Sequence, residues 1–267
     1  MGDWMDWGFS VLGFLVGGIV GMTGMGGGAI MTAALISVFN VPPLTAVGTD
    51  LVYAGVTKFV GTSVHARNGN VDWRVVGLMA LGSVPAAGLS IYGLLLLGPD
   101  NPMVASAVAQ VIGVAVLLAA VTIILRRAVR YARIKSSDLT TQQPASKRRA
   151  LQTVALGFAL GALVAISSVG AGAIGVAILF YLYPRLTAAR IVGSDIAHAV
   201  PLTLLAGLGH SLIGSVDWGL LGLLLIGSIP GILIGSQLAH YVPERILLPL
   251  LALVLAGVGV HLLIFSH

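Results

Sequence analysis

Two aspartates occupy matching positions in the two halves of this apolar sequence. Asp50 follows Thr49 in the motif VGTD, and Asp195 follows Ser194 in the motif VGSD. Each lies about two helical turns inside a segment long enough to cross a membrane. A charged side chain at that depth is costly, so each aspartate should face the interior of the protein. Two roles remain open for it: a site that binds a proton or a cation, or a structural carboxylate that caps backbone N–H groups.

Two glycine-rich runs also match between the halves, at residues 21–29 (GMTGMGGGA) and 166–174 (ISSVGAGAI). Glycine destabilises a helix by about 1 kcal/mol per residue relative to alanine, so each run predicts a break between two half-helices. The N-terminus of a half-helix presents unpaired N–H groups and the positive end of the helix dipole, which attract small anions. Close packing of helices through small residues is the alternative explanation.

The candidate substrate-binding residues are glycines and hydroxyl residues in these runs, together with the hydroxyl residue directly before each aspartate. Glycine lets a ligand approach the main chain, and a serine or threonine hydroxyl adds a hydrogen-bond donor. The residues are Thr23, Gly26, Gly27, Gly28, Thr49, Ser167, Ser168, Gly170, Gly172 and Ser194.

One lysine and one histidine lie within predicted spans near the aspartates. Lys58 is eight residues after Asp50 on a similar helix face, and it could contact an anion, pair with a carboxylate or extend to the cytoplasmic interface. His198 is three residues after Asp195 and shares its face, so it could relay protons or form a hydrogen-bonded packing contact. The candidate proton-coupling residues are therefore Asp50, Asp195 and His198, and Lys58 is a possible anion contact.

The composition predicts an all-α polytopic membrane protein. The chain has 267 residues, of which only 9% are charged, and its mean hydropathy is +1.02. A soluble domain of this length needs far more charged surface. The chain has no cysteine and no GxSxG, HExxH or Walker A motif, so we expect neither an enzyme nor a protein that uses ATP directly. No metal ion or cofactor is expected.

Apolar stretches follow one another in the same order in each half. A long stretch is followed by three spans, and a basic loop separates the two sets. In the first half the stretch is 8–40 and the spans are 44–64, 73–97 and 103–125; in the second half they are 151–182, then 187–212, 218–240 and 246–265. The predicted domains are a first membrane repeat (1–125), a basic cytoplasmic linker (126–150) and a second membrane repeat (151–267).

The charge distribution predicts the topology of these repeats. If each long stretch is a helical hairpin broken at its glycines, every Lys and Arg except Lys58 falls on one side of the membrane, as the positive-inside rule prefers. Each half then has three full spans, an odd number, so the two repeats are inverted and their breaks approach each other at the midplane. Whether the hairpins are re-entrant or fully spanning stays open.

Several motifs resemble the TauE/SafE family of sulfite exporters, also called TSUP permeases. They are the glycine run GxxxGxxGMGGG, the VP…AVGTD segment, the GNVDWR turn and the half-chain repetition, and the resemblance covers nearly the whole chain. It implies a multi-pass permease of a bacterial or archaeal inner (plasma) membrane for sulfite, sulfoacetate or other organosulfonates. It also implies export driven by the proton gradient, with the glycine run, Thr49–Asp50 and Ser194–Asp195 at the site.

The sequence therefore predicts a proton-coupled secondary transporter that exports a small sulfur-containing anion. A passive anion channel, or an uptake permease for a different small organic anion, is the alternative. The expected partners are the anion, protons and the lipid bilayer, with a homo-oligomer possible. No nucleic acid is expected, because much of the positive charge lies in the basic loop at 126–149, which we expect to be cytoplasmic.

Overall fold

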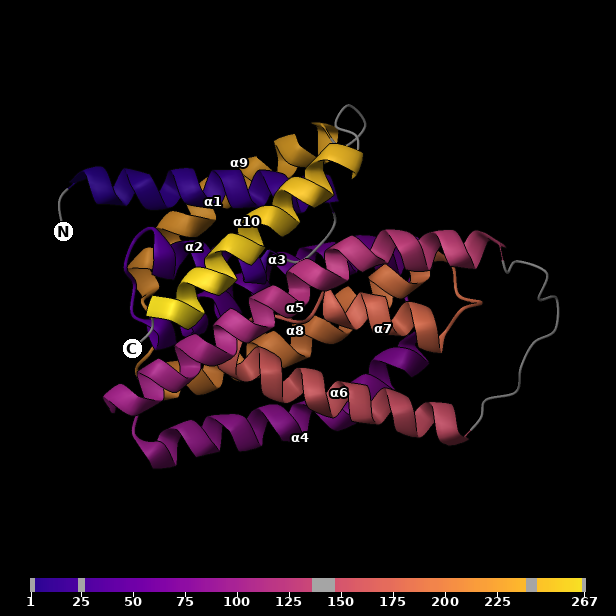
Figure 1. Ribbon diagram of the computed structural model, residues 1–267, viewed down its shortest axis with the longest axis horizontal. Coiled ribbons are helices and arrows are strands. Elements are labelled where there is room, and N and C mark those ends of the chain that lie inside the picture. The colour runs from indigo at the N-terminus through magenta and orange to yellow at the C-terminus, as the bar shows by residue number, and fades with distance from the viewer. Residues whose placement is uncertain (1–2, 24–26, 136–146, 239–243, 266–267) are drawn as a thin grey trace.

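The protein is a bundle of α-helices. The computed structural model describes residues 3–23, 27–135, 147–238 and 244–265, and these form ten helices and no strand. The helices of the first half are α1 (Asp3–Thr23), α2 (Gly28–Ser37), α3 (Pro43–Arg67), α4 (Trp73–Leu97) and α5 (Pro102–Lys135). Those of the second half are α6 (Lys147–Ser167), α7 (Ile174–Leu182), α8 (Ala188–Leu212), α9 (Trp218–Leu238) and α10 (Glu244–Phe265). Figure 1 shows their arrangement.

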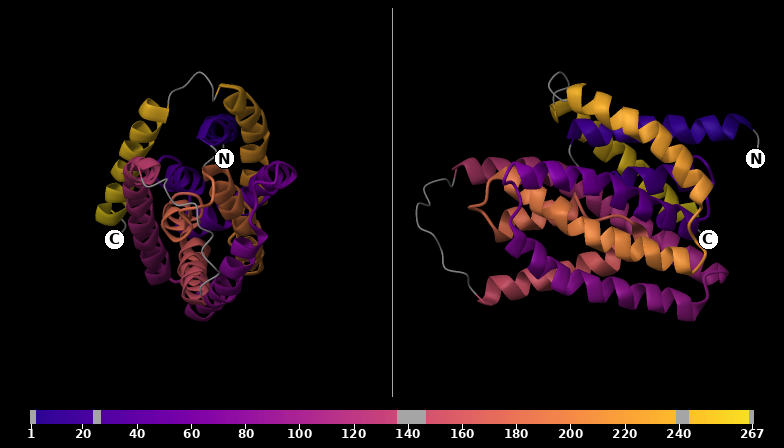
Figure 2. Two further views of the ribbon diagram at one scale, coloured as in Figure 1. Left: turned by 90° about the vertical axis from the view of Figure 1, so that its right-hand side faces the viewer. Right: turned by 180° about the vertical axis from the view of Figure 1, so that it is seen from behind.

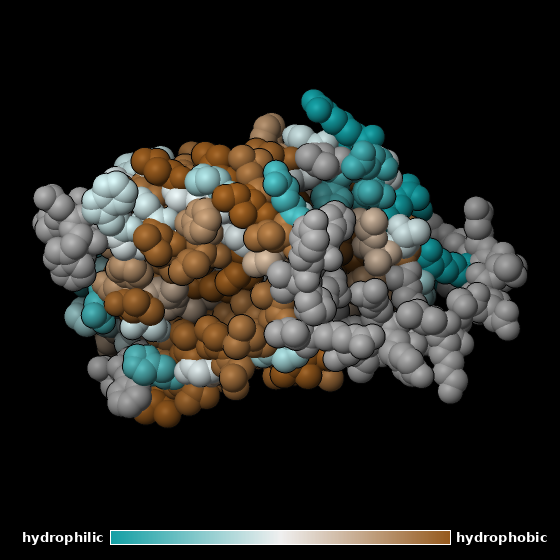
Figure 3. Space-filling model, turned by 90° about the horizontal axis from the view of Figure 1, so that it is seen from above, coloured by the Kyte–Doolittle hydropathy of each residue, from teal (hydrophilic) through white to brown (hydrophobic). Residues whose placement is uncertain are grey.

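Six of the described helices are long and apolar enough to cross a membrane. They are α4, α5 over Pro102–Leu125, α6, α8, α9 and α10 over Leu247–Ile264. Large apolar side chains such as Leu81, Leu96 and Leu253 are exposed on these helices, and Figure 3 shows apolar side chains across the middle of one face. So much exposed apolar surface suits lipid rather than water. The predicted class, an all-α polytopic membrane protein, is confirmed.

Helix α3 is not among these six, although the sequence predicts a span at 44–64. It has the same length as α4, 25 residues, but it is less apolar because it carries Asp50 and Lys58. Both side chains are buried, with exposed fractions of 0% and 8%. Since α3 packs along α8, its polar residues face protein rather than lipid, as intramembrane charges require.

Each long apolar stretch folds back on itself at its glycine run. In the first half α1 ends at Thr23 and α2 begins at Gly28; in the second half α6 ends at Ser167 and α7 begins at Ile174. The short helices have 10 and 9 residues, so each is roughly 15 Å long, about half the thickness of the hydrocarbon core. Both lie among the longer helices of the bundle (Figure 2).

Helices of the two halves pack against each other in matched pairs. Helix α1 packs along α9 and α6 packs along α4, so the first helix of each half lies against the fourth helix of the other. Likewise α3 packs on α8, and α5 on α10. Glycines make the first two contacts close: a Cβ at Gly17 would lie 2.6 Å from the carbonyl oxygen of Ser228, and a Cβ at Gly161 would overlap that of Ser83. For these glycines, close packing is the structural role.

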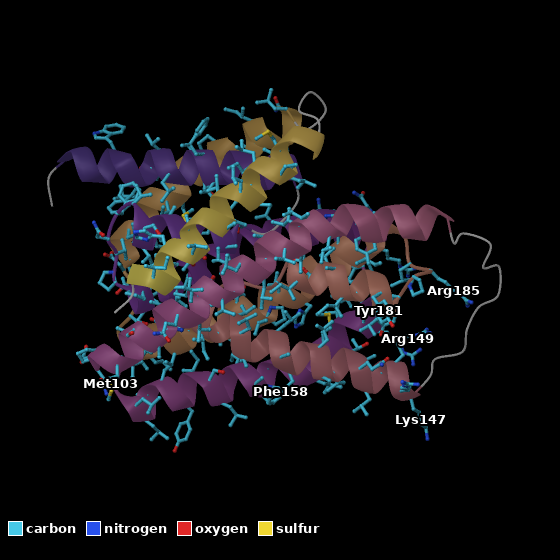
Figure 4. All side chains as sticks on the ribbon, in the orientation of Figure 1. Met103, Lys147, Arg149, Phe158, Tyr181 and Arg185 are labelled. Carbon is cyan, nitrogen blue, oxygen red and sulfur yellow. The ribbon has the colours of Figure 1, made fainter. Side chains whose placement is uncertain are left out.

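The basic segment between the halves is helical at both of its ends. Helix α5 continues to Lys135 and α6 begins at Lys147, while 136–146 lie outside the described residues. Lys147 and Arg185 lie at the end of the bundle opposite the start of α1 and the end of α10 (Figure 4). Lys, Arg and Ala favour helix, so α5 extends well beyond its apolar part.

Candidate functional site

Asp50 joins the two broken hairpins. Its side chain is fully buried in α3. Its Oδ2 accepts a hydrogen bond of 2.6 Å from the Thr32 hydroxyl in α2, and one of 2.8 Å from the Ser168 hydroxyl directly after α6. Its Oδ1 has no hydrogen-bond partner among the described residues. One carboxylate of the first half therefore binds both a half-helix of its own half and the break of the other half.

The two breaks are in direct contact beside this carboxylate. A Cβ added at Gly28 would lie 2.5 Å from the carbonyl oxygen of Ser168 and 3.3 Å from Asp50 Oδ2. Gly28 is the first residue of α2, so the carboxylate lies at the positive end of this half-helix. Ser168 has a φ of 57°, in the left-handed region that residues with a Cβ seldom adopt, and such strain is common at functional sites.

Asp195 lies in the corresponding place in the second half. It is buried in α8, with 1% of its surface exposed. A Cβ added at Gly175, the second residue of α7, would overlap Asp195 Oδ1. Each aspartate therefore lies against the first turn of the short helix in its own half. That is the placement expected of a carboxylate attracted by a helix N-terminus.

Lys58 is a buried amine that interacts with both carboxylates. It interacts electrostatically with Asp195 and with Asp50, and it also influences His198. The lysine is buried rather than extended to the surface. Of the roles open from the sequence, burial argues against extension to the interface, and the electrostatic interactions favour pairing with the carboxylates. A buried cation is stable only when such charges balance it.

His198 forms a polar contact between α8 and α4. Its Nε2 lies 2.8 Å from the Ser83 hydroxyl, and both side chains are fully buried. Tyr53 is the counterpart of His198 in the first half, 145 residues earlier. It faces Ser228 of α9 and interacts electrostatically with Asp50. The two pairs occupy equivalent places in the two halves, although the hydroxyls of Tyr53 and Ser228 have no hydrogen-bond partner among the described residues. Both connect the central α3–α8 pair to the surrounding helices.

The hydroxyls of Thr49 and Ser194 form hydrogen bonds with the main chain and not with the side chain of Asp50. Thr49 Oγ1 accepts a hydrogen bond of 3.0 Å from the backbone N–H of Asp217, and Ser194 Oγ accepts one of 2.8 Å from that of Asp72. The side chains of Asp217 and Asp72 in turn cap α9 and α4. Thr49 and Ser194 thus anchor the helix starts that follow the two VDW motifs.

Three other predicted positions shape the breaks themselves. Ser167 Oγ donates to the Leu163 carbonyl at 2.7 Å and accepts from the Val169 N–H at 3.2 Å, which closes the end of α6. Gly170 and Gly172 have φ values of 128° and 112°, which suit glycine in the second break.

The remaining predicted positions belong to the first break. A Cβ at Gly27 would meet the side chain of Val20, so this glycine packs on α1. Gly26 and the side chain of Thr23 lie outside the described residues.

Four residues of this polar core were missed in the sequence: Thr32, Tyr53, Ser83 and Ser228. Ser83 and Ser228 occupy matching places in the repeated motifs GSVP and GSIP, so a signal for them was present. Thr32 follows Gly28 by four residues, on the same face of a helix, but it has no polar counterpart in the second half.

Comparisons with known proteins agree with this architecture. The family described as "Sulfite exporter TauE/SafE" matches residues 9–262. "Probable membrane transporter protein YjnA" of Bacillus subtilis (strain 168) is 37% identical over 254 residues, which cover 95% of this chain and 98% of the relative. "Probable membrane transporter protein YdhB" of the same organism is 29% identical over 259 residues, or 94% and 97% of the two chains. No solved structure matches the chain.

These matches extend over nearly the whole sequence, and the names of both relatives describe membrane transporters. The six apolar helices identify a multi-pass membrane protein. The chain therefore belongs to the TauE/SafE sulfite exporter family, which is a family of membrane transporters and not of enzymes.

Proposed function

We propose that the protein is a proton-coupled secondary transporter of small sulfur-containing anions, such as sulfite, sulfoacetate or another organosulfonate. The observation that carries the proposal is the contact between the two helix breaks around Asp50. The family description supports sulfite and export as the first substrate and direction to test.

The groups around Asp50 are those that recognise an oxyanion. The Thr32 and Ser168 hydroxyls donate into the centre of the cluster, and Lys58 contributes a buried positive charge. The first turns of α2 and α7 add the positive ends of two helix dipoles. Sulfonate and sulfite present several acceptor oxygens within a small volume, which such donors can share. The site therefore suits a small anion with clustered oxygens.

Proton coupling is assigned to the carboxylates inside the bundle. Asp50 and Asp195 are both buried, and Lys58 interacts with each of them. Taking up a proton changes the charge of this enclosed cluster by a whole unit, which a low-dielectric interior makes energetically large. His198 lies one helical turn from Asp195, and we propose that it assists proton movement on that side.

The arrangement of the halves supports an inverted repeat. The matched pairs α1–α9 and α6–α4 are those that a two-fold axis between inverted halves produces. Lys147 and Arg185 share one end of the bundle, and the start of α1 lies at the other (Figure 4). By the positive-inside rule the end with Lys147, and the linker with it, is cytoplasmic.

A flux assay on purified protein in liposomes tests the proposal. The panel is sulfite, sulfoacetate, taurine and thiosulfate, each with and without a pH gradient. Gly28→Val should abolish flux, because its side chain would collide with Ser168. The matched control is Gly222→Val, since a Cβ at Gly222 meets nothing within 4 Å.

The outcomes separate the proposal from its alternatives. Saturable, gradient-dependent flux of a sulfur anion supports the proposed carrier. Flux that rises linearly with concentration and ignores the pH gradient would indicate a channel. Flux of no panel member, from intact reconstituted protein, would contradict the proposed substrate class.

A further inference from the structure

The anion site of the proposed function already contains an anion of the protein's own. The carboxylate of Asp50 accepts both hydroxyl donors, one from Thr32 and one from Ser168. It also lies against Gly28 at the start of α2, where the helix dipole attracts negative charge. These are the groups that a transported anion would need. As long as Asp50 keeps them, an incoming anion has to compete with it.

The structure also shows where this competition can be relieved. Asp50 Oδ2 accepts both hydrogen bonds, while the buried Oδ1 has no partner among the described residues. A proton on Oδ1 would make the carboxyl neutral without removing any existing contact of that atom. Hydrogen bonds to an ionised acceptor are about twice as strong as those to a neutral one, so protonation weakens the hold of Asp50 on both hydroxyls.

We propose that the transported anion binds only when Asp50 is protonated, so that anion and proton cross the membrane together in the same direction. The inference rests on the proposed function and specifies its coupling. Protonation frees the Thr32 and Ser168 hydroxyls, and the anion accepts them in place of the carboxylate. When the anion leaves on the opposite side, Asp50 loses its proton there and again accepts the hydrogen bonds of the two hydroxyls. The step forms and breaks only the bond between Oδ1 and the proton.

The charge of the cluster supports this order of events. With Asp50 and Asp195 ionised and Lys58 protonated, the cluster carries one net negative charge. A monovalent anion bound beside a protonated Asp50 gives the same total, whereas binding beside an ionised Asp50 doubles it. Like charges repel strongly in a buried site, so the second combination is disfavoured.

Several titratable groups surround Asp50. On its own helix Tyr53 and Lys58 interact with it, and from α8 Asp195 and His198 reach the cluster through Lys58. The second break contributes the Ser168 hydroxyl. Helices α2 and α9 carry no Asp, Glu, His, Lys, Arg or Tyr. Asp195 is the other carboxylate of the cluster and belongs to the proposed proton-coupling groups, so the matched control is Asp100, an exposed aspartate outside the cluster.

Co-transport fixes how the gradients act. An inward proton gradient drives uptake of the anion, and export runs when the anion is concentrated enough inside to carry its proton outward. Export driven by an inward proton gradient would require exchange, in which anion and proton move in opposite directions. Because the anion and the ionised Asp50 share the same donors, the inference does not allow exchange, and it departs here from the export that the family resemblance implies. The direction of flux thus depends on the proton gradient and the anion gradient together. In either direction one proton accompanies each anion.

Isothermal titration calorimetry of the purified protein tests the inference. Binding of sulfite, sulfoacetate, taurine and thiosulfate is measured near neutral pH in two buffers with different ionisation enthalpies, which gives the number of protons taken up per anion. Sulfoacetate has a sulfonate that stays ionised and a carboxylate that can itself take up a proton, so comparison with Asp50→Asn separates proton uptake by Asp50 from uptake by the ligand. We expect wild type to take up about one proton per anion and its affinity to fall about tenfold per pH unit in alkaline solution. Asp50→Asn should take up none and lose the pH dependence, whereas Asp100→Asn, which changes an exposed carboxylate between α4 and α5, should still take up one.

Each result decides between the possibilities. Binding to wild type without proton uptake would overturn the inference and leave the proposed transporter standing, and so would unchanged uptake in Asp50→Asn. The wild-type proton number is informative even if that variant does not fold. Binding only to Asp50→Asn would support the blockade by the resident carboxylate. Binding of no panel member to either protein would contradict the proposed function and the inference together.

Discussion

The hydroxyl of Ser168 donates a hydrogen bond of 2.8 Å to Oδ2 of Asp50, across 118 residues of sequence. This bond connects the helix break of one half to the third helix of the other half. It gives the two breaks a common partner, a buried carboxylate that is also hydrogen-bonded to Thr32. An event at that carboxylate can therefore affect both hairpins at once.

Ser168→Ala should weaken both stability and anion binding. It removes a hydrogen bond to a charged acceptor, so we expect a loss of about 1–2 kcal/mol and a midpoint of thermal unfolding lower by a few degrees in detergent. Ser63→Ala is the control, because Ser63 is exposed and its hydroxyl bonds only to the carbonyl of Phe59 on its own helix. Equal midpoints for the two variants would show that the Ser168 bond contributes nothing.

Thr49→Val and Ser194→Ala should destabilise the protein without altering proton uptake on anion binding. Each removes the acceptor of a backbone N–H, at Asp217 or Asp72, and should cost about 1 kcal/mol. Thermal unfolding and the calorimetric proton number measure the two effects separately. A changed proton number with unchanged stability would indicate that these hydroxyls belong to the binding site, as the sequence alone predicts.

Single cysteines test whether the halves are inverted. The chain has no native cysteine, so Pro42→Cys and Arg185→Cys each introduce one reactive thiol. The two positions lie in equivalent connections, between α2 and α3 and between α7 and α8. In intact cells a membrane-impermeant maleimide should label position 42 only, and position 185 should react after the membrane is permeabilised. Labelling of both from outside would contradict the inverted arrangement.

Gly28→Val should stop transport while leaving the bundle inserted. Its side chain would displace the Ser168 backbone, where the breaks meet. Gly222→Val, with open space around the new Cβ, should transport normally. We expect the initial rate of Gly28→Val to be lower by roughly a hundredfold or more, about the effect of misplacing a reacting group by an ångström. Comparable rates would show that the contact between the breaks is not required.

Much of the fold could be predicted from the sequence because membrane helices follow simple rules. Apolar length located most spans, and glycine runs too costly for a continuous helix located both breaks. Helix α3 has the length of a span but is not among the six helices apolar enough to be one, yet its buried Asp50 and Lys58 lie against α8. Hydropathy cannot anticipate this, because it does not say which neighbours enclose a helix.

The site could be predicted only in part. Asp50, Ser168 and Gly28 come together as expected, since a duplicated break and a buried acid are strong signals. Thr49 and Ser194 have the right type and depth, but their hydroxyls turn to backbone N–H groups of the opposite half. Such a choice depends on tertiary packing, and no local pattern reveals it. Thr32 was missed for the same reason, as a single hydroxyl in an apolar helix.

The most direct test of the account is the initial rate of radiolabelled sulfoacetate uptake into proteoliposomes, with and without an acidic exterior, for wild type and Asp50→Asn. We predict that the gradient accelerates and concentrates uptake in wild type and has no effect on the variant, because only an ionisable group at this position links the proton to the anion. Gradient-driven accumulation by Asp50→Asn, equal to that of wild type, would contradict the account.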